Sequence, residues 1–216
     1  LEMPSPIVPR NLRFEIEERI NFKGEIIKSL DEKGLIKVAK KIVKSGVETL
    51  AIVFMHSFKN AIHEKLAKKI IEAHAPNLNV CLSSIVSPEI GEYERTSTSV
   101  ANAYVQPIFK TYVTSLVKGL KKIGITNDLF LMLSDGGIVH QKTAIEFPIR
   151  LVQSGPAGGA QAATLYGKIL KQNNILCFDM GGTTAKACLI ENGKPNRTTV
   201  FEVARVFRFS KGSGLP

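Results

Sequence analysis

The chain has 216 residues, of which 44% are hydrophobic and 22% charged, and its formal net charge is +10. This length and apolar content predict a globular protein with a substantial core and exclude general disorder. The longest apolar stretches, such as 50–55, are far shorter than the roughly 20 residues that a membrane span needs, so no membrane-spanning segment is expected.

The first stretch, LEMPSPIVPRNL, contains three prolines, has no methionine at position 1 and lacks the basic-then-apolar pattern of a secretion signal. It is expected to be the middle of a longer polypeptide. Alternating apolar and charged residues at 12–31 then predict two antiparallel strands. Asp31 is available as the N-cap of a helix over 32–44, whose apolar stripe ends at Ser45-Gly46.

The next three segments predict a strand, a helix and a strand. The strand at 47–56 is apolar, the helix at 61–74 carries an apolar stripe, and the short strand at 79–84 follows a Pro-Asn break. This succession predicts parallel pairing with helices on the sheet faces.

A long helix is expected after residue 86, with Ser87 as its cap and Pro88 at its first position. Pro107 is expected to kink or divide it. The half before Pro107 is polar, and its Arg95, Thr96 and Thr98 indicate a cleft wall; the alternative is a solvent-facing helix with hydroxyl-to-backbone bonds.

A strand over 127–140 is expected to break at Ser134-Asp135-Gly136-Gly137. Residues 149–153 predict another strand, followed by a glycine-rich turn and a helix that Pro156 opens. Asp135 is a further candidate for a cleft.

Residues 175–190, ILCFDMGGTTAKACLI, predict a β-hairpin, and they match neither a P-loop nor a dinucleotide fingerprint. Backbone amides in a glycine turn can converge on an anion, and threonine hydroxyls add donors. The groups that could bind phosphate are those of Gly181, Gly182, Thr183 and Thr184, and Asp179 could meet a hard cation such as Mg²⁺. The same pattern also occurs in an ordinary tight turn, so spacing leaves both interpretations open.

The lysines and cysteines favour ordinary structural roles over binding sites. The lysine-rich segments KVAKKIVK, EKLAKKI, VKGLKKIG and YGKILK have the spacing of solvated helix faces, and no aromatic stacking motif accompanies them, so no nucleic-acid partner is expected. A nucleic-acid-binding module stays an alternative, which predicts steep salt dependence. Cys81, Cys177 and Cys188 fit neither a disulfide scaffold nor a zinc cluster, which favours a reducing, cytoplasmic location.

The histidines are not expected to bind metal. His56, His63 and Glu64 lack the spacing of a helical metallohydrolase pair, whereas Ser57 or Asn60 could cap the helix that follows. No nucleophilic triad can be assembled, so the catalytic residues are unknown at this stage.

Six segments in the same order resemble the HyuA family, which comprises ATP-dependent N-methylhydantoinase, 5-oxoprolinase and acetone or acetophenone carboxylase subunits. These segments are HSFKNAIHE, SSIVSPEIGEYERTSTSVANAYVQP, LSDGGIV, LVQSGPAGGAQAA, FDMGGTTAKACLI and KGSGLP. The resemblance implies an α/β fold: an actin-like (ribonuclease H-like) ATPase lobe with a mixed sheet flanked by helices, and an incomplete second lobe.

The resemblance also implies an organisation of the chain. Residues 1–84 would be the C-terminal part of the hydantoinase/oxoprolinase N-terminal domain, and residues 85–216 the start of the hydantoinase A/oxoprolinase domain. Within the latter, residues at about 155–170 would form the interlobe helix and those at about 175–190 the second phosphate-binding hairpin.

The implied activity is ATP-dependent hydrolysis of a cyclic amide such as a hydantoin or 5-oxoproline, whose carbonyl is activated by phosphorylation. An ATP-dependent ketone carboxylase subunit is one alternative, and a non-catalytic, nucleotide-responsive regulator of the same fold is another. The implied cofactors are ATP and Mg²⁺, with Asp179 contacting Mg²⁺ through water, and the implied partner is a HyuB-like second subunit.

The sequence departs from the family pattern in three ways. The first phosphate hairpin and the adenosine-binding region are absent from this sequence, so the fragment is expected to be inactive alone. Many relatives read Gly-Gly-Thr-Ser-Thr-Asp at the hairpin, whereas this chain reads Gly-Gly-Thr-Thr-Ala-Lys. Lys186 therefore replaces an acidic residue, and its role is open.

Overall fold

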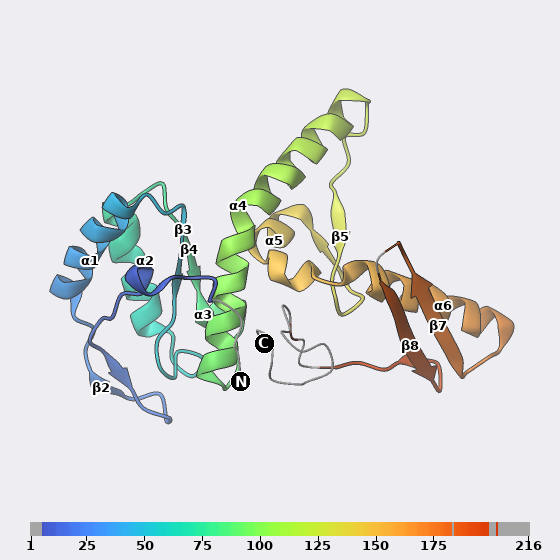
Figure 1. Ribbon diagram of the computed structural model, residues 1–216, viewed down its shortest axis with the longest axis horizontal. Helices are drawn as coiled ribbons and strands as arrows, with labels where there is room; N and C mark the ends of the chain where they lie inside the picture. Colours follow the sequence, from blue (N-terminus) through green and yellow to red (C-terminus); the bar gives the residue numbers. More distant parts are fainter. Residues whose placement is uncertain (1–5, 183, 199–201, 203–216) are drawn as a thin grey trace. The chain divides into compact units, whose positions relative to one another are not determined.

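The computed structural model describes residues 6–182, 184–198 and 202. Contacts divide these residues into two compact units, one that runs up to Ile108 and one that begins at Phe109. Helix α4 (Glu92–Lys122) continues from the first unit into the second (Figure 1). The boundary predicted at residues 84 and 85 stays a prediction.

The first unit contains two short sheets. β1 (Arg19–Ile20) and β2 (Ile26–Lys28) pair antiparallel, as the alternation at 12–31 predicts. β3 (Thr49–Ile52) and β4 (Asn79–Leu82) pair parallel, which confirms the strand-helix-strand prediction. A 3-10 turn, η1 (Arg10–Leu12), precedes the first sheet.

Two helices pack beside the parallel strands and share one core with them (Figure 1). Helix α1 (Glu32–Ser45) begins at Asp31, whose Oδ1 accepts a hydrogen bond from the Gly34 amide at 2.9 Å, and Gly46 ends it in the left-handed conformation. Helix α2 is Ile62–His74. The buried core residues are Leu30, Leu35, Ala39, Ile42, Ile52, Ala67, Ile71 and Leu82.

The long helix begins later than its sequence predicts. A single turn, α3 (Ser83–Val86), follows β4, and α4 begins only at Glu92 because Gly91 takes a φ of +109°. Ser87 is therefore not its N-cap. The helix also continues through Pro107, so this residue does not divide it, and the alternative of a kink stays a prediction.

The second unit is built around helix α6 and small antiparallel sheets. Its elements after α4 are β5 (Phe130–Met132), β6 (Ile138–His140), α5 (Gln141–Glu146), η2 (Pro148–Leu151), α6 (Ser154–Leu170), β7 (Ile175–Met180), β8 (Ala185–Glu191) and β9 (Lys194–Pro195). β5 pairs with β6, and β8 pairs with both β7 and β9. Residues 149–153 hold the end of a 3-10 turn in place of the predicted strand, since Pro148 opens that turn.

The predicted α/β class is confirmed, with parallel and antiparallel pairs both present. Within the described residues, no helix is both long and apolar enough to cross a bilayer.

Helix α6 and strand β7 approach closely at Gly167, a buried residue of the helix. A methyl group there would lie 2.8 Å from the Gln172 carbonyl oxygen and would overlap the Cδ1 atom of Ile175. Gly159, on the same helix, faces open space instead. Packing thus requires glycine at position 167 but not at position 159.

We expect Gly167→Ala to destabilise the protein by about 1–3 kcal/mol, because the added methyl group must displace backbone or the Ile175 side chain. The matched variant Gly159→Ala should raise stability by up to about 1 kcal/mol, since alanine favours a helix and has room. Hydrogen exchange of the α6 and β7 peptides measures both. Equal protection in the two variants would contradict the packing argument.

Candidate functional site

The predicted hairpin is present. β7 and β8 pair antiparallel in a register that runs from Ile175 opposite Ile190 to Met180 opposite Ala185. Residues 181–184 form the turn, in which the Gly181 amide donates to the Thr184 carbonyl at 2.9 Å. Thr183 lies outside the described residues.

The two glycines of this turn are not required by the fold. Neither Gly181 nor Gly182 has a φ in the left-handed region, and a methyl group on either would meet nothing within 4 Å. Gly193, in the next turn, differs because its φ is +72°. The backbone at 181–182 is therefore open to close approach by another molecule, and only glycine leaves both faces of the chain bare.

Asp179 and Lys186 lie directly opposite each other, next to the pair that flanks the turn. Because side chains alternate along a strand, they share one face of the hairpin with Cys177 and Cys188. Asp179 is exposed and Lys186 is half-buried. Among the described residues, neither charged group has a hydrogen-bond or ion-pair partner within the distances that define one.

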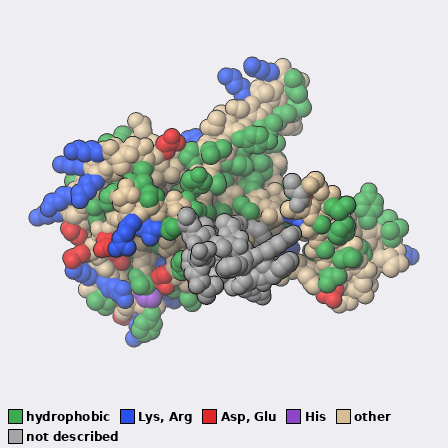
Figure 2. All heavy atoms as spheres, viewed as in Figure 1, with side chains coloured by type: hydrophobic (Ala, Val, Ile, Leu, Met, Phe, Trp, Pro, Cys, Tyr) green, Lys and Arg blue, Asp and Glu red, His purple; other side chains and the backbone are tan. Residues whose placement is uncertain are grey.

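The two faces of the hairpin differ in burial. Ile175 and its partner Ile190 are half-buried and buried, on the face that also carries Asp179. The other face is apolar but exposed, with Phe178 at 61% and Met180 at 72% exposure. Figure 2 shows apolar side chains gathered over this part of the unit. The turn thus projects from a sheet that is covered on one side only.

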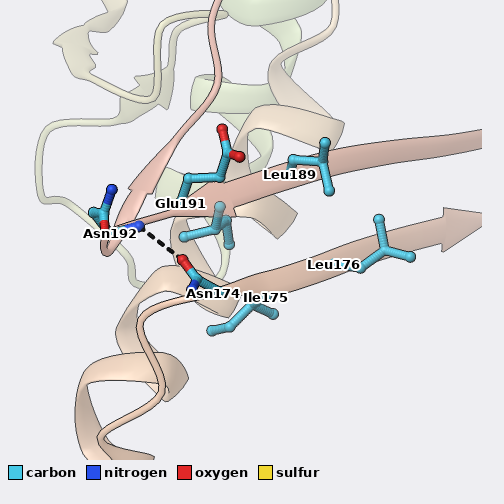
Figure 3. A pocket seen from close by; sticks show the side chains of 7 residues that line it. Asn174, Ile175, Leu176, Leu189, Glu191 and Asn192 are labelled. Atoms are coloured by element: carbon cyan, nitrogen blue, oxygen red, sulfur yellow. Dashed lines mark hydrogen bonds between the residues drawn. The ribbon is translucent and has the colours of Figure 1, made fainter.

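A hollow lies at the opposite end of the hairpin (Figure 3). On its polar side, the Asn192 amide donates a hydrogen bond to Asn174 Oδ1 at 3.1 Å. The remaining lining residues are Ile175, Leu176, Leu189, Ile190 and Glu191. Ile175 is four residues from Asp179, or about 13 Å along an extended strand, so this hollow is not part of the glycine turn.

Asp135, the weaker cleft candidate, has a local role. Its Oδ1 atom accepts a hydrogen bond from the Gly137 amide at 2.7 Å within the turn between β5 and β6. Ser134 Oγ donates to the Arg150 carbonyl oxygen at 2.7 Å and also contacts the carbonyl oxygen of Val152, which ties this turn to the segment before α6. The residues at 134–137 are therefore explained by turn structure.

The first unit holds a buried carboxylate that sequence reasoning missed. Glu64 of α2 is 0% exposed. Its Oε1 atom accepts from the Phe54 amide at 3.2 Å and from Ser83 Oγ at 2.6 Å, and its Oε2 atom accepts from the Ser84 amide at 2.9 Å and from Ser84 Oγ at 2.6 Å. Four donors therefore compensate the carboxylate for its loss of water.

Arg95 belongs to the same buried network and does not line a cleft. Its guanidinium donates to Ser83 Oγ at 3.2 Å and to the carbonyl oxygens of Phe54 and Glu89, at 3.0 and 3.1 Å. Ser83 therefore connects the positive charge to Glu64. Arg95 is 1% exposed, so the polar half of α4 faces inward at this position.

The other polar residues on this stripe of α4 are buried as well. Ser99 and Asn102 follow Arg95 at helical spacing and are 0% exposed. Ser99 Oγ donates to the Arg95 carbonyl at 2.7 Å, and Asn102 Nδ2 contacts Cys81 Sγ at 3.7 Å. The hydroxyl-to-backbone bonds expected for a solvent-facing helix are present, but on a buried face.

Glu92 forms an ion pair with Arg95 from the solvent side, and its Oε1 atom lies 3.5 Å from Arg95 Nη2. Burial alone raises the pKa of Glu92, but the amides of Glu92 and His56 and the Arg95 guanidinium outweigh it and hold this pKa below its ordinary value of 4.5. The ionised carboxylate therefore stabilises the fold above pH 4.5, and this stabilisation is lost as the pH falls through the lowered pKa.

Within the part of the chain that the structure describes, the histidines belong to no group of three or more His, Cys, Asp or Glu side chains that could hold a metal ion. His63 is buried and its Nδ1 atom lies 2.7 Å from Glu18 Oε2, which is also buried. The N-cap of α2 is Ala61, so neither Ser57 nor Asn60 occupies the capping position. Asn60 precedes the cap, and its Oδ1 atom accepts from the Ile62 amide at 3.1 Å.

Comparisons with known proteins match two regions of the chain. The family described as "Hydantoinase/oxoprolinase" matches residues 95–210, and "Hydantoinase/oxoprolinase N-terminal region" matches residues 1–75. An uncharacterised protein of Methanocaldococcus jannaschii is 44% identical over 100% of this chain and 32% of its own length. Caprolactamase subunit alpha of Pseudomonas jessenii is 32% identical over 88% of this chain and 27% of its own.

A solved structure of nucleotide-free acetone carboxylase, from work on ATP-dependent acetone carboxylation, aligns with a TM-score of 0.77 and 29% identity. The alignment covers 88% of this chain and 27% of that one, and it shows that the two share a fold. The chain spans about a third or less of the curated relatives named above.

Proposed function

The chain belongs to the hydantoinase/oxoprolinase family, and on this premise we propose that it is part of an ATP-dependent subunit that hydrolyses a cyclic amide. The observation that carries the proposal is the turn at 181–184: two glycines that the fold does not require lie beside two charges without partners among the described residues. Such an arrangement suits a phosphate chain and its cation.

We propose that the turn holds one side of ATP. The amide of Gly182 and the hydroxyls of Thr183 and Thr184 would donate to phosphate oxygens, while Gly181, whose amide donates to the Thr184 carbonyl, would let the backbone approach them closely. The Asp179 carboxylate is exposed at the end of β7 and suits Mg²⁺ bound through water, since a single carboxylate leaves most of the ion's coordination to water and phosphate. The cation would neutralise the phosphate charge, while the turn fixes its position.

In the proposed reaction the γ-phosphoryl group moves to the amide carbonyl oxygen and ADP leaves. Water then adds to the activated carbon, the C–N bond breaks and phosphate is released. The contribution of this chain is to position the phosphates and stabilise their charge, which are the main sources of catalysis in phosphoryl transfer. The relative named caprolactamase favours this reaction class.

A second candidate is an ATP-dependent ketone carboxylase subunit, which the similarity to the acetone carboxylase structure favours. A third is a nucleotide-responsive protein of the same fold that has no amide or ketone chemistry. The names of the relatives also support a second subunit as partner. We further propose the domain organisation expected from the sequence, with residues 1–84 in one domain and 85–216 in the next.

The experiment is ATP turnover by the full-length protein together with its partner subunit. Hydantoin, 5-oxoproline, caprolactam, and small ketones with bicarbonate are added in turn, and ADP is measured. The proposal expects stimulation by a cyclic amide. Stimulation by a ketone with bicarbonate alone would select the carboxylase, and ATP binding without stimulation by any substrate would select the regulator.

We expect Gly182→Val in the full-length protein to reduce ATP affinity by roughly 10-fold or more, since losing one hydrogen bond to a charged group costs about 1.5–3 kcal/mol. Stability should hardly change, because a Cβ atom at this position meets nothing within 4 Å. Calorimetric titration with ATP measures the affinity.

Gly193→Ala is the matched control in the neighbouring turn. Its φ of +72° makes the substitution cost about 1–2 kcal/mol of stability, whereas ATP affinity should not change. If the two variants lost ATP affinity equally, the turn at 181–184 would have no special role.

A further inference from the structure

Lys186 is a half-buried lysine at the edge of the proposed phosphate turn. The register places it opposite Asp179 and on the same face of the hairpin. Its ammonium group has no hydrogen-bond or ion-pair partner among the described residues, although a carboxylate stands across from it. An ammonium group that lies across from a carboxylate on the same face, and yet forms no ion pair with it, is available to a ligand.

The position of Lys186 allows its ammonium group to reach the turn. It is two residues after Thr184, which places their Cα atoms about 7 Å apart in an extended strand. The four-carbon stem of lysine spans such a distance. A Cβ atom at Gly181 or Gly182 would meet nothing within 4 Å, so the space beside these two residues is open.

We propose that Lys186 binds the phosphate chain of the nucleotide and makes the site selective for a triphosphate over a monophosphate; this inference rests on the proposed function. Asp179 and Lys186 then bind different parts of the ligand. The carboxylate serves the hydrated cation, and the ammonium group serves phosphate oxygens as a compact point charge. The opposite charges remain apart because each has its own ligand.

The separate roles of Asp179 and Lys186 predict how ATP binding depends on Mg²⁺. Part of the phosphate charge is neutralised by Lys186, so ATP keeps measurable affinity for the wild-type protein when Mg²⁺ is removed. A lysine that only neutralised Asp179 would behave differently. Its removal would free the carboxylate for Mg²⁺ and would leave MgATP binding equal or tighter.

The test is calorimetric titration of the full-length protein with ATP and with AMP, in Mg²⁺ and in EDTA. Lys186→Gln is expected to weaken ATP binding about 10- to 100-fold while AMP binding changes less than about 2-fold, since a hydrogen bond between a charged pair is lost only for the longer phosphate chain. Lys186→Arg should keep most of the ATP affinity. Lys194→Gln, on β9 of the same sheet, is the control and should behave as wild type.

Unchanged or tighter ATP binding in Lys186→Gln would overturn the inference and leave the proposed function standing, because the wild type still binds ATP. An equal loss of ATP and AMP affinity would overturn it too, as would failure of Lys186→Arg to retain ATP. If the wild-type protein binds no ATP in either condition, the proposed function fails and this inference fails with it.

Discussion

Replacing Asp179 with asparagine in the full-length protein is expected to raise the Mg²⁺ concentration needed for half-maximal ATP binding by about 10- to 100-fold, the usual effect of losing a group that holds metal-bound water. Asparagine keeps the size of the side chain and its exposure at the end of β7. It removes the negative charge that suits a hydrated cation. Titration of ATP binding with Mg²⁺ measures the shift, and hydrogen exchange over 175–191 shows that the hairpin persists.

Glu191→Gln is the control for this charge change. Glu191 is exposed at the far end of β8, where its Oε2 atom accepts a hydrogen bond from Asn196 at 2.9 Å. The same loss of one negative charge there should leave the Mg²⁺ dependence unchanged. Wild-type Mg²⁺ dependence in Asp179→Asn would remove Asp179 from the cation site.

Replacing Glu64 with alanine is expected to destabilise the first unit by about 3–5 kcal/mol, the usual cost of leaving a buried charge without its partner. The substitution removes the negative charge that Ser83 links to the buried Arg95 guanidinium, and it leaves the two donors of Ser84 without that acceptor. Hydrogen exchange of α2 and α3 in the full-length protein should rise strongly, because the carboxylate joins these two elements.

Glu72→Ala on the same helix is the matched control. Glu72 is exposed and forms one surface ion pair with Lys68, at 3.6 Å, so its loss should cost less than about 1 kcal/mol. Similar exchange in the two variants would show that the buried network contributes no more than a surface pair.

Local sequence signals predicted most of the elements. Asp31 and Gly46 marked the two ends of α1, and the structure confirms both caps. The hairpin at 175–190 was also correct, because its two apolar segments are separated by a turn of small residues. Errors arose where backbone conformation overrode a preference, as at Gly91, which delays the start of α4 beyond Pro88.

The buried network could be predicted only in part. Glu64 lies on the same helical stripe as the buried Ala67 and Ile71, and a carboxylate on an apolar stripe is a signal of a buried polar group. The sequence does not show its partners, because Ser83 and Ser84 approach it from another element. The polar stripe of α4 was therefore assigned to a cleft or to solvent, although it faces the interior.

Only the register of the two strands shows that Asp179 and Lys186 lie opposite each other. The sequence shows that seven positions separate them, but only a pairing of Met180 with Ala185 places them opposite each other. A turn shifted by one residue would have put them on opposite faces of the hairpin. The structure thus changes an open question about Lys186 into a testable one.

The central claim is that the turn at 181–184 holds ATP phosphates. Its most direct test is a crystal structure of the full-length protein with Mg²⁺ and a non-hydrolysable ATP analogue. The account predicts a phosphate oxygen about 3 Å from the amide nitrogen of Gly182. An analogue bound elsewhere, with this turn free of phosphate, would contradict it.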